Sequence, residues 1–166
     1  MVELLVTYLE MTRPPEGTSL SCPVAEARVE RETLNAATYL AVYRSVGEPL
    51  QWDGRLLMSP SELQEFLNGA ATHIYILRLG GVPVGLCEFD NVGQADVELT
   101  NFGLIPGAQG QRLGPYLLDY AIRKIWSHLP QRIWLHTDTE DHPKAITTYQ
   151  RAGFTIYKRC LEIFPD

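Results

Sequence analysis

The residues best suited to chemistry lie between an expected strand, DVELTNFGLI from Asp96, and an expected helix that begins near Leu113. This junction holds three glycines and three polar side chains: Gly107, Gly110, Gly114, Gln109, Gln111 and Arg112. Free N–H groups at a helix N-terminus attract anions, and glycines let a ligand approach the backbone closely. The spacing fits neither the G-x-G-x-x-G fingerprint nor the P-loop, because Pro115 follows the last glycine. The junction therefore predicts either a simple turn or another kind of phosphate-binding loop.

Histidines and carboxylates gather in a second stretch, HTDTEDHP, at residues 136–143. These residue types ligate metals, but they also act as caps where a strand ends and a helix begins. Pro143 suits the first position of such a helix. We therefore expect capping here, and no metal.

The composition is that of a soluble globular domain. The chain has 166 residues, 45% of them hydrophobic and 20% charged, and a net charge of −6. An acidic chain is a poor partner for nucleic acid, whereas it suits a cationic substrate. Cys22, Cys87 and Cys160 follow no metal-ligand spacing, and no segment has the apolar length of a signal peptide or a membrane span. We expect a cytoplasmic protein with reduced thiols that binds neither nucleic acid nor membrane.

Hydrophobic periodicity and turn residues predict the elements that position these groups. We expect a first strand at 2–11, a loop at 13–23 and a helix over 31–46 that ends at Gly47. A second helix follows Ser59, which has Pro60 after it and Glu62 three residues on, as in a capping box.

The second half of the chain alternates strands with helices. Three strands form an antiparallel meander, and they are followed by the glycine junction, a helix to about Ser127, a strand, a helix and a last strand. Gly153 and Phe154 are typical of the end of a helix. The order predicts a mixed α/β fold whose sheet cannot be wholly parallel.

Two motifs give the chain a family resemblance. Gln109–Gly114 resembles the pyrophosphate loop of the GNAT superfamily of acetyl-CoA-dependent N-acyltransferases, Q/R-x-x-G-x-G/A, with Arg112 where glycine is usual. The C-terminal pattern N-x-x-A-x-x-x-Y-x-x-x-G-F of that superfamily is matched by Ala145, Tyr149, Gly153 and Phe154, with His142 at the asparagine position. The element order agrees as well, so the resemblance covers nearly the whole chain.

The resemblance implies a GNAT fold in a single domain, 1–166, with a mostly antiparallel sheet of about six to seven strands and four helices. It implies acetyl-CoA as co-substrate, held by one set of residues: Phe102, Leu104, Gln109, Gly110, Gln111, Arg112, Leu113, Gly114, His142 and Ala145. In the superfamily, splayed strands leave N–H groups free for the acetyl oxygen, and Phe102 and Leu104 stand at the matching place. The activity it implies is transfer of the acetyl group to a primary amine of a small molecule or peptide, by direct attack in a ternary complex.

Two residues are candidates for proton transfer. An alkylammonium, with a pKa near ~10.4, must lose a proton before it can attack a thioester. Glu98 stands where some GNAT enzymes carry a catalytic glutamate, although it could equally be a solvated strand carboxylate, with a water chain as base. On an ideal strand Glu98 shares a face with Phe102 and Leu104. Tyr149 is the candidate general acid for the leaving thiolate, or otherwise a core aromatic.

The acceptor is the least determined part. Tyr43, Trp52, Asp53 and His136 are candidates to hold a cationic amine, although the first three could simply cover an edge of the core. Three alternatives stay open: a non-catalytic acyl-CoA-binding or regulatory domain, an enzyme with a hydroxyl or antibiotic acceptor, and a structural domain whose glycines only turn. The last strand could also pair across a homodimer.

Overall fold

Seven strands form one sheet in the computed structural model of the chain, which describes residues 1–165, and their order is β2-β3-β4-β5-β6-β1-β7. In chain order they are β1 (Val2–Met11), β2 (Ala27–Arg31), β3 (His73–Leu79), β4 (Val82–Asp90), β5 (Asp96–Leu104), β6 (Arg132–Asp138) and β7 (Thr155–Phe164). The α-helices are α1 (Ala36–Gly47), α2 (Pro60–Asn68), α3 (Leu113–Trp126) and α4 (Ala145–Ala152). Short 3-10 helices lie at Glu48–Leu50, Gly54–Leu57 and Pro106–Ala108. The expected mixed α/β fold is confirmed.

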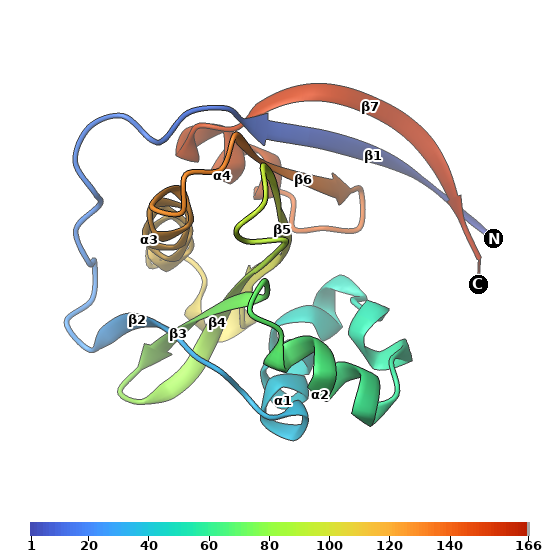
Figure 1. Cartoon of the computed structure of the whole chain (residues 1–166), viewed down its shortest axis with the longest axis horizontal. Coiled ribbons are helices and arrows are strands. Elements are labelled where there is room, and N and C mark those ends of the chain that lie inside the picture. The colour runs from blue at the N-terminus through green and yellow to red at the C-terminus, as the bar shows by residue number, and fades with distance from the viewer. Residues whose placement is uncertain (166) are drawn as a thin grey trace.

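The first strand lies far from the next one in the sheet. β1 is inserted between β6 and β7 and pairs antiparallel with both, whereas β2 forms the opposite edge. Val2–Leu5 pair with β7 alone, because pairing with β6 begins at Val6. The outer parts of β1 and β7 thus form a two-stranded arm that curves away from the domain, with the pair Val2 and Phe164 near its tip (Figure 1). The connection from β1 to β2 has to run around the outside of α3.

The expectation of a helix from residue 31 is wrong at its start. Residues 27–31 form β2, paired with β3, and α1 begins only at Ala36 after its cap Asn35, whose side chain accepts from the Thr38 N–H at 2.8 Å. Only Val29 of β2 is buried, so the strand carries almost no hydrophobic pattern. Its backbone bonds to β3 hold it in place, and these are invisible in local sequence.

Other local signals are confirmed. Ser59 and Glu62 form a capping box at the start of α2. α4 ends at Gly153 with φ +117°, and the Phe154 N–H donates to the Tyr149 carbonyl at 3.0 Å. Among residues 1–165, no helix is long and apolar enough to span a bilayer.

Two core layers cover the sheet. α3 and α4 pack on one face, with Leu117, Ile122 and their neighbours fully buried, while α1 and α2 cover the other face with Tyr39, Val46 and Leu63. β5 and β6, the one parallel pair, are joined only from Asp96–Arg132 to Glu98–Trp134. Beyond Glu98 the two strands have no paired residues, so the sheet opens between the two layers.

A β-bulge re-aims the side chains of β5 where this opening begins. Asn101 pairs with Glu88 and Leu99 with Phe89, so Thr100 is an extra residue on β5. The expectation that Glu98 shares a face with Phe102 and Leu104 is therefore wrong. Phe102 and Leu104 pack against the α3–α4 core, whereas Glu98, beside buried Val97 and Leu99 of that core, points to the opposite face.

Candidate active site

A cavity of about 360 Å³ lies where β5 leaves β6. Its walls come from the end of β5, the loop 109–114, the start of α3, and α4 with the residues before it. The cavity brings together most residues that the sequence assigned to the co-substrate: Phe102, Leu104, Gln109, Gly110, Arg112, Leu113, Gly114, His142 and Ala145. Gln111 belongs to the same loop but is not among the lining side chains. The cavity thus joins both motifs, which are separated in sequence by α3 and β6.

The loop 109–114, which lines the cavity, has a left-handed backbone at two residues. Gly110 has φ +82° and Arg112 has φ +63°. Arg112 thus adopts the conformation for which glycine is favoured, at a cost of about 1–2 kcal/mol for a residue with a side chain. The N–H groups of residues 110–114 make no turn, loop or cap hydrogen bond within the described chain. The loop can therefore offer these N–H groups to an anion at the start of α3.

The backbone of β5 supplies further donors. The Ile105 N–H donates to the Val84 carbonyl on β4 at 2.8 Å. Because N–H directions alternate along a strand, those of Leu104 and Phe102 point away from β4, into the opening left by β6. These two N–H groups can stabilise negative charge on an oxygen held in the cavity.

Tyr149 of α4 lines the cavity. Its ring packs against Phe102 and Phe154 with centroid distances of 5.7 and 5.9 Å. Its hydroxyl has no hydrogen-bond partner among residues 1–165, although the side chain lines the cavity. Burial raises the pKa of Tyr149 well above its usual value, so the phenol stays protonated at neutral pH. It can donate a proton to an anion that forms beside it.

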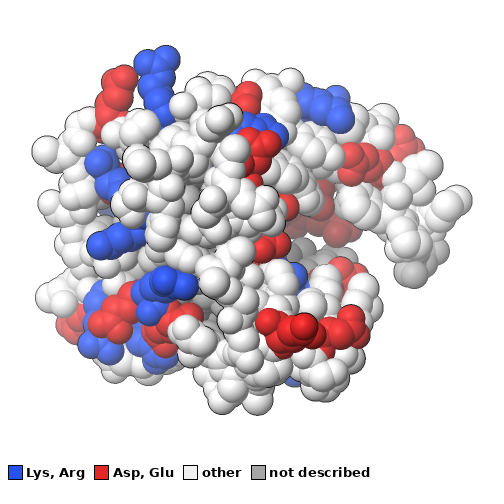
Figure 2. Space-filling view, in the orientation of Figure 1, with Lys and Arg blue, Asp and Glu red and all other residues white. Residues whose placement is uncertain are grey.

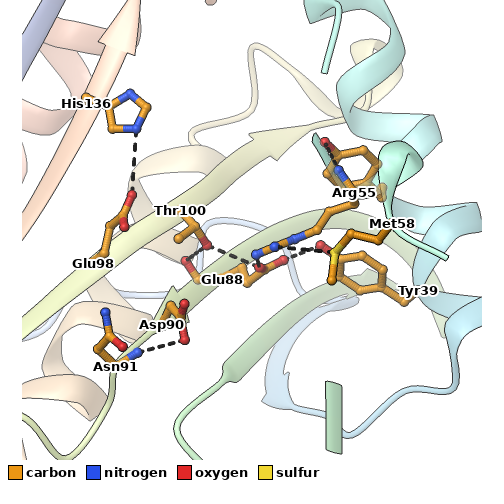
Figure 3. Close-up of polar contacts among 10 residues, drawn as sticks. Tyr39, Arg55, Met58, Glu88, Asp90, Asn91, Glu98, Thr100 and His136 are labelled. Carbon is orange, nitrogen blue, oxygen red and sulfur yellow. Dashed lines mark hydrogen bonds and ion pairs between the residues drawn. The ribbon is translucent and has the colours of Figure 1, made fainter. Parts of the chain in front are cut away.

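Glu98 faces the other side of the sheet (Figure 3). Its Oε2 lies 3.7 Å from Nε2 of His136 on β6. Burial raises the pKa of Glu98, and the nearby His136 imidazole opposes that rise. A carboxylate with a raised pKa is a better proton acceptor at neutral pH than an ordinary glutamate.

Sequence reasoning missed a buried polar cluster next to Glu98. Glu88 on β4 is fully buried and contacts the Tyr39 hydroxyl, the Arg55 guanidinium and, at 3.2 Å, the Thr100 hydroxyl (Figure 3). Burial raises the pKa of Tyr39, and Glu88 raises that of Arg55 against the effect of burial. The ion pair fastens the segment between α1 and α2 to the sheet. The sequence did offer one signal of this cluster: Glu88 stands inside the apolar run VPVGLCEFD, and a carboxylate in a buried strand needs a partner.

The same segment reaches the cavity through Leu50. Leu50 lines the cavity, and the Trp52 ring packs on Tyr43 with a centroid distance of 5.4 Å. Trp52 also covers Gly47 and approaches Gly103 of β5, where a Cβ would lie 3.6 Å from the ring. Tyr43 is buried, and its hydroxyl accepts the Arg55 N–H at 3.3 Å. Tyr43 is therefore a buried support for Trp52, whereas Trp52 is partly exposed and Asp53 is exposed to solvent.

β1 adds residues that the sequence did not point to. The Tyr8 ring lies 5.8 Å from His136, and its hydroxyl donates to Glu162 of β7 at 2.6 Å. That bond lowers the pKa of Glu162. Figure 2 shows a hollow between the β1–β7 arm and the α1–α2 part, with Asp and Glu side chains on its borders.

The expectation that residues 136–143 cap a helix with Pro143 at its first position is wrong. α4 begins only at Ala145, and the residue before it, Lys144, makes no side-chain cap bond, so the stretch is a turn held by its own hydrogen bonds. Thr137 donates to Asp141 at 2.6 Å, and Nδ1 of His142 accepts the Lys144 N–H at 3.1 Å. Nε2 of His142 lies 3.2 Å from the Gln109 side-chain oxygen, which ties the loop to α4. No group of three potential ligands that could hold a metal occurs in the part of the chain that the structure describes.

Comparison with known proteins gives a consistent result. The sequence profile of the acetyltransferase (GNAT) family matches residues 39–154. No curated protein matched the sequence. A GCN5-related N-acetyltransferase from Sphaerobacter thermophilus superposes with a TM-score of 0.67 at 19% identity, over 95% of this chain and 50% of that one.

Two further solved structures share the fold. A tandem GNAT protein from the clavulanic acid biosynthesis pathway has a TM-score of 0.71 at 16% identity, over 95% of this chain and 52% of its own. An aminoglycoside acetyltransferase from an uncultured soil metagenomic sample has a TM-score of 0.69 at 14% identity, over 85% of this chain and 96% of its own. The chain thus spans about half the length of two of these three proteins. Since the family profile covers more than half of the sequence, and the fold agrees, the chain belongs to the GNAT family of acetyltransferases.

Proposed function

We propose that the protein is an N-acetyltransferase that moves the acetyl group of acetyl-CoA to a primary amine of a small molecule or peptide. One observation carries the proposal: the loop 109–114, with its unpaired N–H groups, and Tyr149 line one cavity, and Glu98 lies on the other face of the sheet where the pairing of β5 with β6 ends. We also propose that residues 1–166 act as one acetyltransferase domain, since β1 and β7 from the two ends complete one sheet.

The cavity fits acetyl-CoA by the chemistry of its donors. Backbone N–H groups at a helix N-terminus suit a pyrophosphate, and the apolar side chains of Phe102, Leu104 and Ala145 suit the pantetheine chain. Bound acetyl-CoA supplies an activated thioester. Leu104 and Phe102 N–H groups would then stabilise the carbonyl oxygen as it gains negative charge.

Glu98 and Tyr149 divide the proton transfers. Glu98, directly or through a water, takes the proton from the amine before or during attack, and its raised pKa suits that role. Tyr149 gives its proton to the sulfur as the thiolate leaves. Tyr149 belongs to the α3–α4 layer and Glu98 points to the opposite face of the sheet, so the amine and the thioester can meet in the opening between β5 and β6.

The acceptor side favours a cationic amine. We place the amine on the face of the sheet where Glu98 of β5 and Glu162 of β7 lie. The aromatic rings of Tyr8, Trp52 and His136 belong to the same face. Carboxylates and aromatic rings together attract an ammonium group. A solved structure with this fold is an aminoglycoside acetyltransferase, so aminoglycosides belong among the amines to be tried.

The test combines binding with turnover. Calorimetry should show that acetyl-CoA binds, while ATP and NAD do not, and that the variant Gln109→Ala/Gly110→Asp loses binding while it stays folded. A thiol-release assay should then find turnover with at least one of a panel of polyamines, aminoglycosides and lysine peptides. A folded wild type that does not bind acetyl-CoA would refute the proposal. Binding without turnover on any amine would leave a non-catalytic acyl-CoA-binding domain.

A further inference from the structure

Glu88 lies at the border between the α1–α2 layer and the face of the sheet that carries Glu98. On β4 it comes two residues after Leu86, which is buried in the α1–α2 core, and it pairs with β5 next to the bulge. Its side chain is fully buried, and it is not among the residues that line the cavity. Figure 3 shows the resulting row of side chains, from Arg55 through Glu88 and Thr100 toward Glu98.

Both carboxylate oxygens of Glu88 are bound by other elements. The Tyr39 hydroxyl of α1 donates to Oε1, and the Arg55 guanidinium donates to Oε2. The Thr100 hydroxyl lies 3.2 Å from Oε2 and 3.2 Å from the Glu88 carbonyl oxygen. Because Thr100 is the extra residue of the bulge, this hydroxyl fastens the bulge to β4 where the ladder is interrupted. One carboxylate thus joins α1, the segment between α1 and α2, and the bulge of β5.

Arg55 carries the link on to the aromatic residues of the same face. Its backbone N–H donates to the Tyr43 hydroxyl at 3.3 Å, and its guanidinium lies over the Phe66 ring of α2, 4.2 Å from the centroid. The Tyr43 ring in turn packs on Trp52 with a centroid distance of 5.4 Å. The position of Trp52 therefore depends on how Arg55 is held.

Stability alone is a poor explanation for this cluster. Nε of Arg55 is buried and has no hydrogen-bond partner within residues 1–165, so the guanidinium is incompletely satisfied. Desolvation of a buried ion pair offsets much of its attraction, and apolar residues of similar volume often stabilise a core at least as well. What the pair does provide is one fixed arrangement of the elements it joins, because separating the two charges inside the core is strongly unfavourable.

We propose that Glu88, Arg55 and Thr100 are positioning residues for the acetyl transfer. Through Thr100, Glu88 fixes the bulge and with it the direction of Glu98. Through Arg55, it fixes the ring of Trp52 beside the amine. The inference rests on the proposed function, because positioning matters only if Glu98 takes a proton from an amine. Reaction rates depend steeply on such placement, since a shift of about 1 Å can lower them about 10²-fold.

The hydroxyl of Thr100 is tested by Thr100→Val, which keeps the volume and removes both contacts, and by Thr100→Ser, which keeps the hydroxyl. A thiol-release assay at saturating acetyl-CoA gives kcat and KM for the amine of the panel that the wild type acetylates fastest. Thr100→Val should lower kcat about 10–100-fold, while the Kd for acetyl-CoA by calorimetry stays within about twofold. Thr100→Ser should recover most of the wild-type kcat. Wild-type kcat in Thr100→Val, or no recovery in Thr100→Ser, would overturn the inference.

The ion pair has a matched control near the other edge of the sheet. Arg78 of β3 donates two hydrogen bonds to Glu32, at 2.8 and 2.7 Å. Arg55→Lys keeps the charge but loses the planar fork of donors, so it should lower kcat/KM for the amine at least about tenfold. Arg78→Lys should leave kcat/KM within about twofold of the wild type, since it is a partly exposed pair away from the site. Equal effects of the two substitutions would overturn the inference, because they would reflect a general loss of stability.

The variant Tyr39→Phe/Arg55→Met/Glu88→Leu removes the whole cluster together with its charges. It should still unfold cooperatively, since apolar residues can replace a buried ion pair, yet it should lose most of its turnover. Wild-type turnover in this variant would overturn the inference and leave the proposed function in place. Should it fail to fold, the two Thr100 variants still decide. A wild type without turnover on any amine would overturn both proposals.

Discussion

Gly103 of β5 lies against Val46 of α1 and Trp52 of the segment between α1 and α2. A Cβ at this position would lie 2.8 Å from Cγ1 of Val46, closer than packed carbons can approach, and 3.6 Å from the Trp52 ring. Val46 is buried on α1, so it has little room to move. Overpacking of this kind costs about 1–3 kcal/mol, and alanine recovers about 0.5–1 kcal/mol of the entropy that glycine loses in a strand. Gly103→Ala should therefore lower the free energy of unfolding by about 1–2 kcal/mol.

Denaturant unfolding measures this change directly, and the melting temperature should fall by about 2–8 °C. The matched control is Gly114→Ala, where the nearest atoms, in Leu104 and Phe102, would lie 3.8 Å from the new Cβ. In that helix the same substitution should be neutral or stabilising by up to about 1 kcal/mol. Adding Val46→Ala to Gly103→Ala should remove the clash, so the double variant should be more stable than the two single effects predict. Additive effects, or a Gly103→Ala protein as stable as the wild type, would refute the reasoning.

Three further predictions concern the site. Tyr149→Phe should lower kcat about 10²–10⁴-fold while the Kd for acetyl-CoA stays within about twofold, and unchanged turnover would remove its role. Since the base must be ionised and burial raises the pKa of Glu98, kcat/KM should fall as the pH drops through that raised pKa, at a pH above that of an ordinary glutamate. Glu98→Gln should abolish this acidic limb, and a wild-type limb that persists in the variant would point to another base. Arg112→Gly should be about 1 kcal/mol more stable than Arg112→Ala in denaturant unfolding, because only glycine adopts φ +63° without strain; equal stabilities would contradict this.

Local chemistry explains what the sequence predicted well. The capping box at Ser59, the helix end at Gly153 and the strand–loop–helix order around Gln109 each depend on a few neighbouring residues. The turn at residues 137–144 is local too, since Thr137 bonds to Asp141 and His142 to Lys144, but α4 begins two residues later than Pro143 suggested. Short-range bonds of this kind are encoded by residue type and spacing, so they can be predicted without a partner strand.

Long-range pairing explains what the sequence did not predict. β2 has a single buried side chain, and only its ladder with β3 makes it a strand. The bulge at Thr100 depends on the register of β5 against β4, and one extra residue moved Phe102 and Leu104 to the face opposite Glu98. The buried pair of Glu88 and Arg55 joins elements 33 residues apart, and neither residue alone signals the other.

The sequence by itself determined the mixed α/β fold class, the strand–loop–helix junction around Gln109 and the order of the elements other than β2, because hydrophobic periodicity, caps and glycine positions act over a few residues. Only the tertiary structure decided which side chains meet. It placed β1 between β6 and β7, which brought Tyr8 beside His136 and sent the connection 12–26 around α3, where it lines a second cavity. The physical reason is that pairing between distant strands is set by the burial of whole faces, which no short stretch of sequence contains.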